Sequence, residues 1–257
     1  MNQTPAKFFK KNGYCIINLF NNEIIENIKQ EVNDKLNSFC KELNNNLKLK
    51  NLKNYHKLKI TENDHKYFVK NSSRYIKLNS KIIKKIKLNK KFVNILKNFW
   101  GHSNTSITWV GSLEKKNSIK KNATAFRIAK PKPSSDVGGV HYDLPYGRQK
   151  VPNKDHKALV TIWCPLVGFS EKYTLKISPK SHIPKHSLSK ILKQKKFLSP
   201  VFDKNYVKKF KYMRPRLKKG QAIIFHPNLL HGASYNRGKN TRVSLDLRIF
   251  NSKKVKF

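Results

Sequence analysis

The sequence predicts an α+β fold, in which helices near the amino terminus back a sheet that forms a sandwich or barrel. Apolar residues recur at helical spacing in the first hundred residues, whereas short strand-like segments separated by turns fill most of the remainder. The segment after Arg242 also alternates polar and apolar residues, as expected for a strand with one packed face and one polar face. Helices followed by many antiparallel strands are typical of the α+β class.

The first elements are a short strand and two helices. Gly13–Phe20 predicts the strand, and Asn22 can then cap a helix. The apolar stripe of this helix comprises Ile25, Ile28, Val32, Leu36, Phe39 and Leu43. Ile82–Trp100 predicts a second helix that Gly101 ends. Residues 44–80 are polar and lysine-rich, and their pattern assigns no element.

Strands are expected after Gly101. The candidates are Ser106–Leu113, Thr124–Ala129, Val140–Asp143, Ala158–Pro165, Tyr173–Ile177, Gln221–Phe225 and Val243–Ile249. Along the last of these, Arg242, Ser244, Asp246 and Arg248 share one face, and Val243, Leu245, Leu247 and Ile249 share the other. A barrel with a functional interior needs such a polar inner face.

The chain of 257 residues can form one large domain, and no linker or repeat divides it. We therefore expect a single domain over 1–257, with 1–105 as mainly helical support. No stretch approaches the roughly 18 apolar residues that span a bilayer, and the amino terminus lacks the apolar core of a secretory signal. Cys15, Cys40 and Cys164 fit neither a disulfide framework nor a zinc site, so a reducing cytoplasm is the expected location.

The formal net charge of +42 would ordinarily suggest a nucleic acid or an anionic membrane as partner. The basic residues are mostly lysines spread along the whole chain, and asparagine and isoleucine are also abundant, so compositional drift explains most of the charge. Nucleic acid is therefore expected to bind only nonspecifically, and attraction of an anionic substrate is the remaining interpretation.

Two histidines and a carboxylate, in the order His141-Tyr142-Asp143 and then His231, suit a facial triad that holds Fe(II) and leaves positions open. On a strand, residues two apart project to the same side, so His141 and Asp143 can reach one metal ion. Arg242 suits a clamp for the carboxylate of a bidentate organic co-substrate. Together these residues predict an iron- and 2-oxoglutarate-dependent oxygenase.

Over roughly residues 124–250 the sequence resembles the phytanoyl-CoA dioxygenase-like family of 2-oxoglutarate oxygenases. The segments that carry the resemblance are Phe126-Arg127-Ile128, His141-Tyr142-Asp143, Thr161–Leu166, Leu175–His182, Gly220–Gly232 and Asn236 with Thr241–Arg248. The family folds as a double-stranded β-helix, a jelly-roll or cupin-like barrel, which this resemblance implies for 106–250. Lys180 and the pair Lys172-Tyr173 depart from the family's usual glycine-containing turns.

The resemblance implies a role for each matching residue. His141, Asp143 and His231 would hold Fe(II), and Arg242 would pair with the distal carboxylate of 2-oxoglutarate. Trp163 and Ser244 would lie against the co-substrate. Dioxygen and 2-oxoglutarate would be consumed, with release of succinate and CO2, to hydroxylate a substrate; desaturation and ring closure stay open.

The substrate is expected to be a small metabolite, anionic or sugar-like in chemistry, and acyl-CoA is suggested only by the family name. Residues 144–157 are a candidate lid over the metal strand. Arg127, Arg148 and Arg248 are candidates to meet an anionic group on the substrate. The alternatives are a nucleic-acid- or polyanion-binding protein on the same fold, and an oxygenase that hydroxylates protein or nucleic acid.

Overall fold

The structure is a computed structural model and describes nearly all of the amino-terminal half and most of the predicted strands. The described ranges are 3–71, 74–110, 119–131, 139–143, 158–170, 174–183, 191–192, 201–232 and 235–255. The expected lid 144–157, with Arg148, and the pair Lys172-Tyr173 lie outside these ranges.

Helices occupy most of the chain before residue 101. They are α1 (Pro5–Asn12), α2 (Asn22–Leu43), the 3-10 helix η1 (Leu52–Lys57), α3 (Glu62–Asn71), α4 (Ser80–Lys87) and α5 (Lys90–Trp100); a short α7 (Lys204–Lys208) comes later. The predicted helix with the long apolar stripe is confirmed as α2. Its cap is Asn21 rather than Asn22, because the Asn21 side chain accepts a hydrogen bond from the Ile24 N–H at 3.0 Å.

The single helix predicted over Ile82–Trp100 is wrong, because the chain turns between α4 and α5. Asn89 caps α5 by accepting from the Phe92 N–H at 3.1 Å, and its side-chain amide donates to the Asn18 carbonyl at 2.8 Å. This second contact lies far away in sequence, so helical periodicity alone could not reveal the break. Gly101 ends α5 with φ 80°, as its position predicted.

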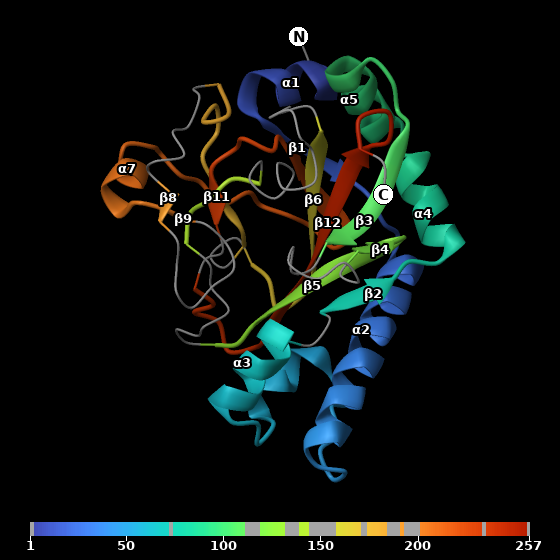
Figure 1. Ribbon diagram of the computed structural model, residues 1–257, viewed down its shortest axis with the longest axis vertical. Helices are drawn as coiled ribbons and strands as arrows, with labels where there is room; N and C mark the ends of the chain where they lie inside the picture. Colours follow the sequence, from blue (N-terminus) through green and yellow to red (C-terminus); the bar gives the residue numbers. More distant parts are fainter. Residues whose placement is uncertain are drawn as a thin grey trace.

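Eight of the described strands form one antiparallel sheet, in the order β1-β10-β6-β12-β3-β4, with β5 and β2 attached beside β12. The strands are β1 (Tyr14–Asn18), β2 (Tyr75–Lys77), β3 (Thr105–Val110), β4 (Ile119–Lys121), β5 (Ala123–Ala129), β6 (Leu159–Val167), β10 (Gln221–Phe225) and β12 (Arg242–Asn251). The long β12 pairs with β6 along one edge and with β5 and β3 along the other, so it is central (Figure 1).

Two smaller sheets lie on the side of the molecule away from the long helices (Figure 1). One pairs β7 (Lys176–Ile177) with β11 (His231–Gly232), and the other pairs β8 (Ile191–Leu192) with β9 (Val201–Phe202). The segment Val140–Asp143, predicted as a strand, makes only one bridge, between His141 and His231. The α+β class is confirmed, but the described strands do not close into a barrel, so the double-stranded β-helix remains a prediction.

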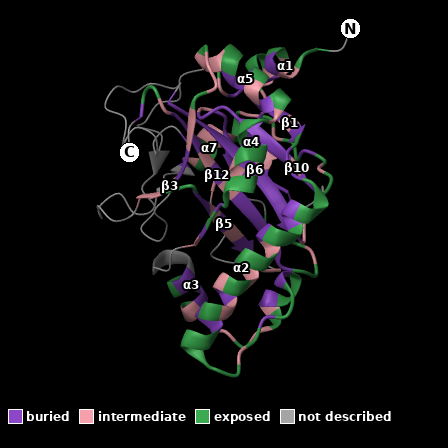
Figure 2. Ribbon diagram, turned by 90° about the vertical axis from the view of Figure 1, so that its right-hand side faces the viewer, coloured by how far each residue is buried: buried purple, intermediate pink, exposed green. Residues whose placement is uncertain are grey.

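The main core lies between the helices and one face of the large sheet. Ile25 and Ile28 of α2 belong to the same buried cluster as Ile162 of β6 and Leu245 and Leu247 of β12. Buried strands therefore lie behind helices whose outer faces are exposed (Figure 2). The predicted alternation of β12 is confirmed on this side, and its polar residues face the other side of the sheet.

Residues 44–80, which the sequence left unassigned, contain η1, α3 and β2 and brace the start of β12. The Lys53 carbonyl accepts the Thr241 N–H at 2.8 Å, and the His56 Nδ1 lies 3.0 Å from the Thr241 hydroxyl. These contacts hold Thr241, the residue directly before Arg242. No helix in the described part of the chain combines the length and apolarity that a membrane span requires.

Candidate metal centre

His141, Asp143 and His231 come together on the face of the sheet opposite the helices. A pair of backbone hydrogen bonds, each 2.9 Å, joins His141 and His231 in an antiparallel bridge. Gly232, which follows His231, lies close to Gly139: a Cβ added to Gly232 would lie 3.2 Å from the carbonyl oxygen of Gly139. The bridge sets the two imidazole rings side by side, with ring centres 4.4 Å apart.

Each imidazole is oriented by the chain just before it. The Nδ1 of His141 lies 2.9 Å from the Gly139 carbonyl oxygen, and the Nδ1 of His231 lies 2.9 Å from that of Leu229. A carbonyl only accepts, so both Nδ1 atoms carry a proton, and it is the Nε2 atom of each ring that can offer a lone pair to a metal. The two Nε2 atoms lie 3.9 and 3.7 Å from Asp143 Oδ1, and the three ligand atoms fit within 4.8 Å of one another.

The two oxygens of Asp143 have different surroundings, although the side chain is fully buried. Its Oδ2 accepts from the Thr161 hydroxyl at 2.5 Å and from Nη1 of Arg248. Its Oδ1, which faces the histidines, has no hydrogen-bond partner among the residues that the structure describes. A buried carboxylate oxygen without a partner is costly, and a cation between Oδ1 and the two Nε2 atoms would satisfy it. Two imidazoles and one carboxylate form the donor set of Fe(II) oxygenases, so the residues fit that metal.

The charges of the site favour metal binding at neutral pH. Burial, and next the neighbouring His231, lower the pKa of His141 to about 4, which keeps this ring neutral and able to bind a metal. Burial by itself would raise the pKa of Asp143. The Arg248 guanidinium holds that pKa below its usual value, so the carboxylate stays ionised.

The polar face of β12 leads from Arg248 toward the start of the strand. Arg242 and Ser244 are buried, with 5% and 2% of their surface exposed. They lie opposite Ala129 and Arg127 of β5 in an unbroken register that continues to Asp246. Arg242, Ser244 and Asp246 therefore share the face from which Arg248 reaches Asp143, as the alternation predicted.

Trp163 of β6 lies on this face as well, between Asp246 of β12 and Ile223 of β10. It packs in a buried apolar cluster with Phe225, whose ring centre is 4.4 Å from that of His231. The apolar cluster thus forms one wall beside the histidines. A contact between Trp163 and a co-substrate remains a prediction.

The arginines proposed to meet substrate have different surroundings. Arg127 has 42% of its side chain exposed and donates to Asp246 from Nη2 at 2.9 Å. The Arg248 side chain is only 14% exposed and forms ion pairs with Asp143 and Asp246. Arg248 therefore binds a candidate metal ligand, Asp143. Sequence reasoning gave no role to Thr161 or Asp246. The alternation of β12 signalled Asp246, but nothing in the local sequence signalled Thr161.

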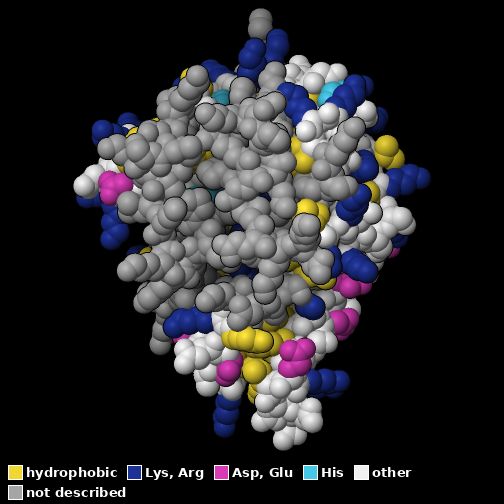
Figure 3. All heavy atoms as spheres, viewed as in Figure 1, with side chains coloured by type: hydrophobic (Ala, Val, Ile, Leu, Met, Phe, Trp, Pro, Cys, Tyr) yellow, Lys and Arg dark blue, Asp and Glu magenta, His cyan; other side chains and the backbone are white. Residues whose placement is uncertain are grey.

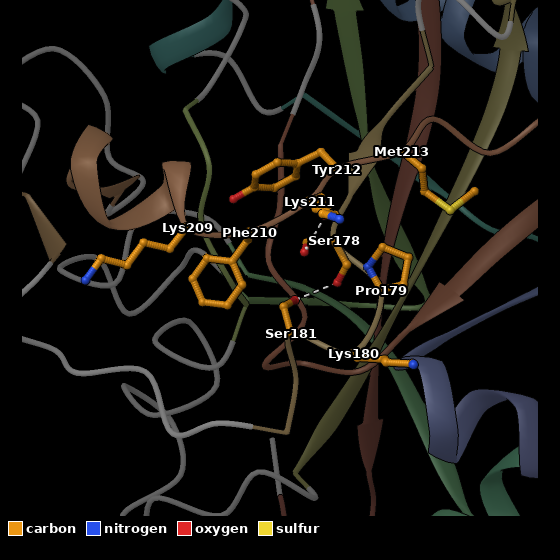
Figure 4. A pocket seen from close by; sticks show the side chains of 9 residues that line it. All are labelled: Ser178, Pro179, Lys180, Ser181, Lys209, Phe210, Lys211, Tyr212 and Met213. Atoms are coloured by element: carbon orange, nitrogen blue, oxygen red, sulfur yellow. Dashed lines mark hydrogen bonds between the residues drawn. The ribbon is translucent and has the colours of Figure 1, made fainter.

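A cavity of about 480 Å³ lies beside β7, and none of its lining residues belongs to the triad. It is lined by Ser178, Ser181, Phe210 and Tyr212, among others (Figure 4). The Ser181 hydroxyl donates to the Ser178 carbonyl at 2.7 Å and accepts from the Leu230 N–H at 2.8 Å. This cavity therefore adjoins the residue before His231 from outside the metal centre.

On the face of the molecule that Figure 3 shows, the described lysines and arginines are scattered rather than gathered in one stripe. This distribution agrees with the interpretation of the +42 net charge as mostly compositional. A compact basic groove with interleaved aromatic residues would have favoured a nucleic-acid-binding surface.

The comparisons with known proteins agree with this geometry. A family model described as phytanoyl-CoA dioxygenase (PhyH) matches residues 9–244. Among curated proteins, none matches the chain.

One solved structure with the same fold is SnoK, a non-heme alpha ketoglutarate dependent carbocyclase from nogalamycin biosynthesis. The match has a TM-score of 0.57 and 11% sequence identity, and it covers 98% of this chain and 85% of SnoK. EctD from S. alaskensis with bound Fe gives a TM-score of 0.56, 14% identity, and coverage of 100% and 81%. The structure of EctD with 2-oxoglutarate and 5-hydroxyectoine gives a TM-score of 0.56 and 14% sequence identity, and the match covers 100% of this chain and 80% of EctD.

Proposed function

The chain belongs to the phytanoyl-CoA dioxygenase family, and from that premise we propose that it is an Fe(II)- and 2-oxoglutarate-dependent dioxygenase that hydroxylates a small molecule. The convergence of the two His Nε2 atoms on Oδ1 of Asp143, which has no hydrogen-bond partner in the described part of the chain, carries this proposal. The solved structures of similar fold include one with bound Fe and one with 2-oxoglutarate, which supports the choice of metal and co-substrate.

The chain's own residues divide the work as follows. His141, Asp143 and His231 hold the iron, and Arg242 pairs with the distal carboxylate of 2-oxoglutarate through its planar fork. Ser244, two residues along the same face of β12, donates a further hydrogen bond to the co-substrate. When bound, iron with 2-oxoglutarate supplies oxidation by dioxygen, coupled to release of succinate and CO2. The apolar wall of Trp163 and Phe225 keeps water from one side of the site.

We also propose that residues 1–257 form a single domain whose sheets complete a double-stranded β-helix. The buried cluster that joins the amino-terminal helices to β6 and β12 supports one domain. The small sheet of β7 and β11 supports the β-helix, because Ile177 of β7 packs in the same buried cluster as Trp163 and Ile223 of the large sheet, and β11 carries His231.

Arg127 is the residue best suited to receive an anionic group of the substrate. Its side chain is 42% exposed and lies on the strand next to Ser244. Because Arg127 offers a half-exposed positive charge beside the proposed co-substrate site, we propose a small anionic metabolite. Replacing Arg127 with glutamine should raise KM for the true substrate more than it lowers kcat, and an unchanged KM would remove this assignment.

The oxygenase proposal is tested by binding and by turnover. We expect the anaerobic protein to bind Fe(II), to develop a visible charge-transfer band when 2-oxoglutarate is added, and to release succinate in air. His141→Ala should lose all three properties. His102→Ala, which removes a histidine that contacts Trp100 and Asn104 instead, should retain them. If neither Fe(II) nor 2-oxoglutarate binds the wild-type protein, the proposal is wrong.

A further inference from the structure

We infer that Thr161 and Arg248 are positioning residues for Asp143, because together they hold its Oδ2 and leave only Oδ1 to a metal ion. The inference rests on the proposed function, since it concerns how the same metal centre is held. It also gives Arg248 a role other than direct contact with substrate.

The three side chains form a closed set of hydrogen bonds. Thr161 donates to Asp143 Oδ2 at 2.5 Å, and Arg248 Nη1 donates both to this oxygen and to the Thr161 hydroxyl at 2.7 Å. A guanidinium only donates and a carboxylate only accepts, so the single Thr161 proton must point to Asp143. Every donor and acceptor direction in this set is therefore determined.

The sheet register produces this arrangement. Arg248 of β12 and Thr161 of β6 are direct cross-strand partners, so their side chains leave the same face of the sheet next to each other. Asp143 comes from a separate segment, whose backbone N–H donates to the Pro227 carbonyl at 2.8 Å. The central sheet thus supplies the clamp, and the segment with the histidines supplies the ligand.

A second ion pair holds Arg248 in turn. Its Nη2 lies 3.4 Å from Asp246 Oδ2, and the same oxygen accepts from Nη2 of Arg127 at 2.9 Å and from its Nε at 3.3 Å. Arg127, Asp246, Arg248 and Asp143 therefore form a continuous chain of opposite charges. The chain runs from a half-exposed arginine to the fully buried metal ligand.

This clamp has a chemical consequence for the metal. A carboxylate with two available oxygens can bind a metal through both, which would occupy one more coordination position. With Oδ2 held by two donors, Asp143 binds through Oδ1 alone, and the positions that a two-point co-substrate and dioxygen require stay open. Partners of metal ligands commonly matter in this way for metal affinity.

The test is a titration of the full-length apoprotein with Co(II) alone, monitored by the visible absorption of the bound ion. Thr161→Val removes the hydroxyl without changing charge or size. We expect it to weaken Co(II) binding roughly 10- to 100-fold and to change the shape of the Co(II) spectrum. Thr161→Ser should restore both the affinity and the spectrum. Thr124→Val is the matched control, because Thr124 is an equally buried strand threonine whose hydroxyl donates to the adjacent Ala125 carbonyl; its affinity should equal that of the wild type.

Arg248→Lys provides a second, independent variant, because it keeps the positive charge but loses the fork that reaches both Asp143 and Thr161. We expect the same spectral change with weaker Co(II) binding. Wild-type affinity and spectrum in both Thr161→Val and Arg248→Lys would overturn the inference while leaving the oxygenase proposal intact. If wild-type protein binds no Co(II), or if His141→Ala binds it equally well, both proposals fail.

Discussion

Gly168 occupies a position where a single methyl group should disturb the proposed co-substrate site. It follows β6 with φ +65°, and an added Cβ would lie 2.0 Å from the Thr241 carbonyl oxygen and 2.9 Å from the Cα of Arg242. The backbone of Thr241 is itself bound by Lys53 at 2.8 Å, so it cannot yield without breaking that hydrogen bond. The Gly168→Ala variant should therefore displace the start of β12.

The chain contains a matched control for the backbone part of this effect. Gly101 has φ +80°, but an added Cβ there meets nothing within 4 Å. Both alanine variants incur the left-handed backbone cost of about 1–2 kcal/mol. Only Gly168→Ala adds a clash, and forcing atoms into a packed site costs about 1–3 kcal/mol more. With about 2–4 °C lost per kcal/mol in a domain of this size, its Tm should lie about 2–12 °C below that of Gly101→Ala.

Thermal unfolding of the two variants measures this difference, and calorimetric titration of the metal-loaded proteins with 2-oxoglutarate measures its functional consequence. We expect Gly168→Ala to bind 2-oxoglutarate more weakly than the wild type, and Gly101→Ala to bind it equally well. If the two variants lose the same Tm, the argument from the close approach to Thr241 is wrong. If Gly168→Ala is less stable but binds 2-oxoglutarate normally, Arg242 is not the clamp.

Three further predictions concern other residues of the fold and the site. Arg242→Lys keeps the charge but loses the two-point fork, so we expect the 2-oxoglutarate Kd to rise about tenfold or more; an unchanged Kd in the same titration would contradict the assignment. Burial would raise the pKa of Asp246, but Arg248 and Arg127 hold this pKa below its usual value. The ion pairs of Asp246 therefore stabilise the fold at pH values above its pKa in the unfolded chain, which is about 3.9. This stabilisation is lost as the pH falls toward the lower pKa of the folded protein. Asp246→Asn should therefore show a shallower loss of unfolding free energy between about pH 5 and 3 than the wild type in urea titrations, and equal slopes would refute this reasoning. Asn89→Ala removes the cap of α5 and should cost about 1 kcal/mol in the same assay, whereas no loss would mean that the cap does not stabilise the break between α4 and α5.

The sequence was sufficient to predict features whose determinants are close together along the chain. His141 and Asp143 are two residues apart, and the alternation of polar and apolar residues in β12 is enough to place Arg242 and Asp246 on the polar face. The apolar stripe of α2 was equally clear. The predictions for α2 and β12 succeeded because strand and helix periods are local properties, whereas the strand predicted for Val140–Asp143 makes only one bridge.

Features that depend on register or on distant contacts were not predictable. The clamp on Asp143 exists because Thr161 and Arg248 are paired across β6 and β12, and no local pattern states that register. The break between α4 and α5 combines a local signal, the Asn89 cap, with a hydrogen bond from Asn89 to Asn18 on a distant strand. The remote partners in both cases could not be read from local periodicity.

The charge balance of the site explains why an anionic co-substrate suits it. Asp143 and Asp246 carry two negative charges, and Arg127 and Arg248 balance them within the ion-paired chain. Arg242 lies on the same buried face, and a divalent metal would add two positive charges. Electrostatic interactions are stronger in such poorly hydrated surroundings than at the surface, so this local excess favours a dianion and disfavours a neutral ligand of the same shape. The few charges next to Asp143 therefore bear on function more directly than the +42 of the whole chain, most of which comes from lysines spread along the sequence.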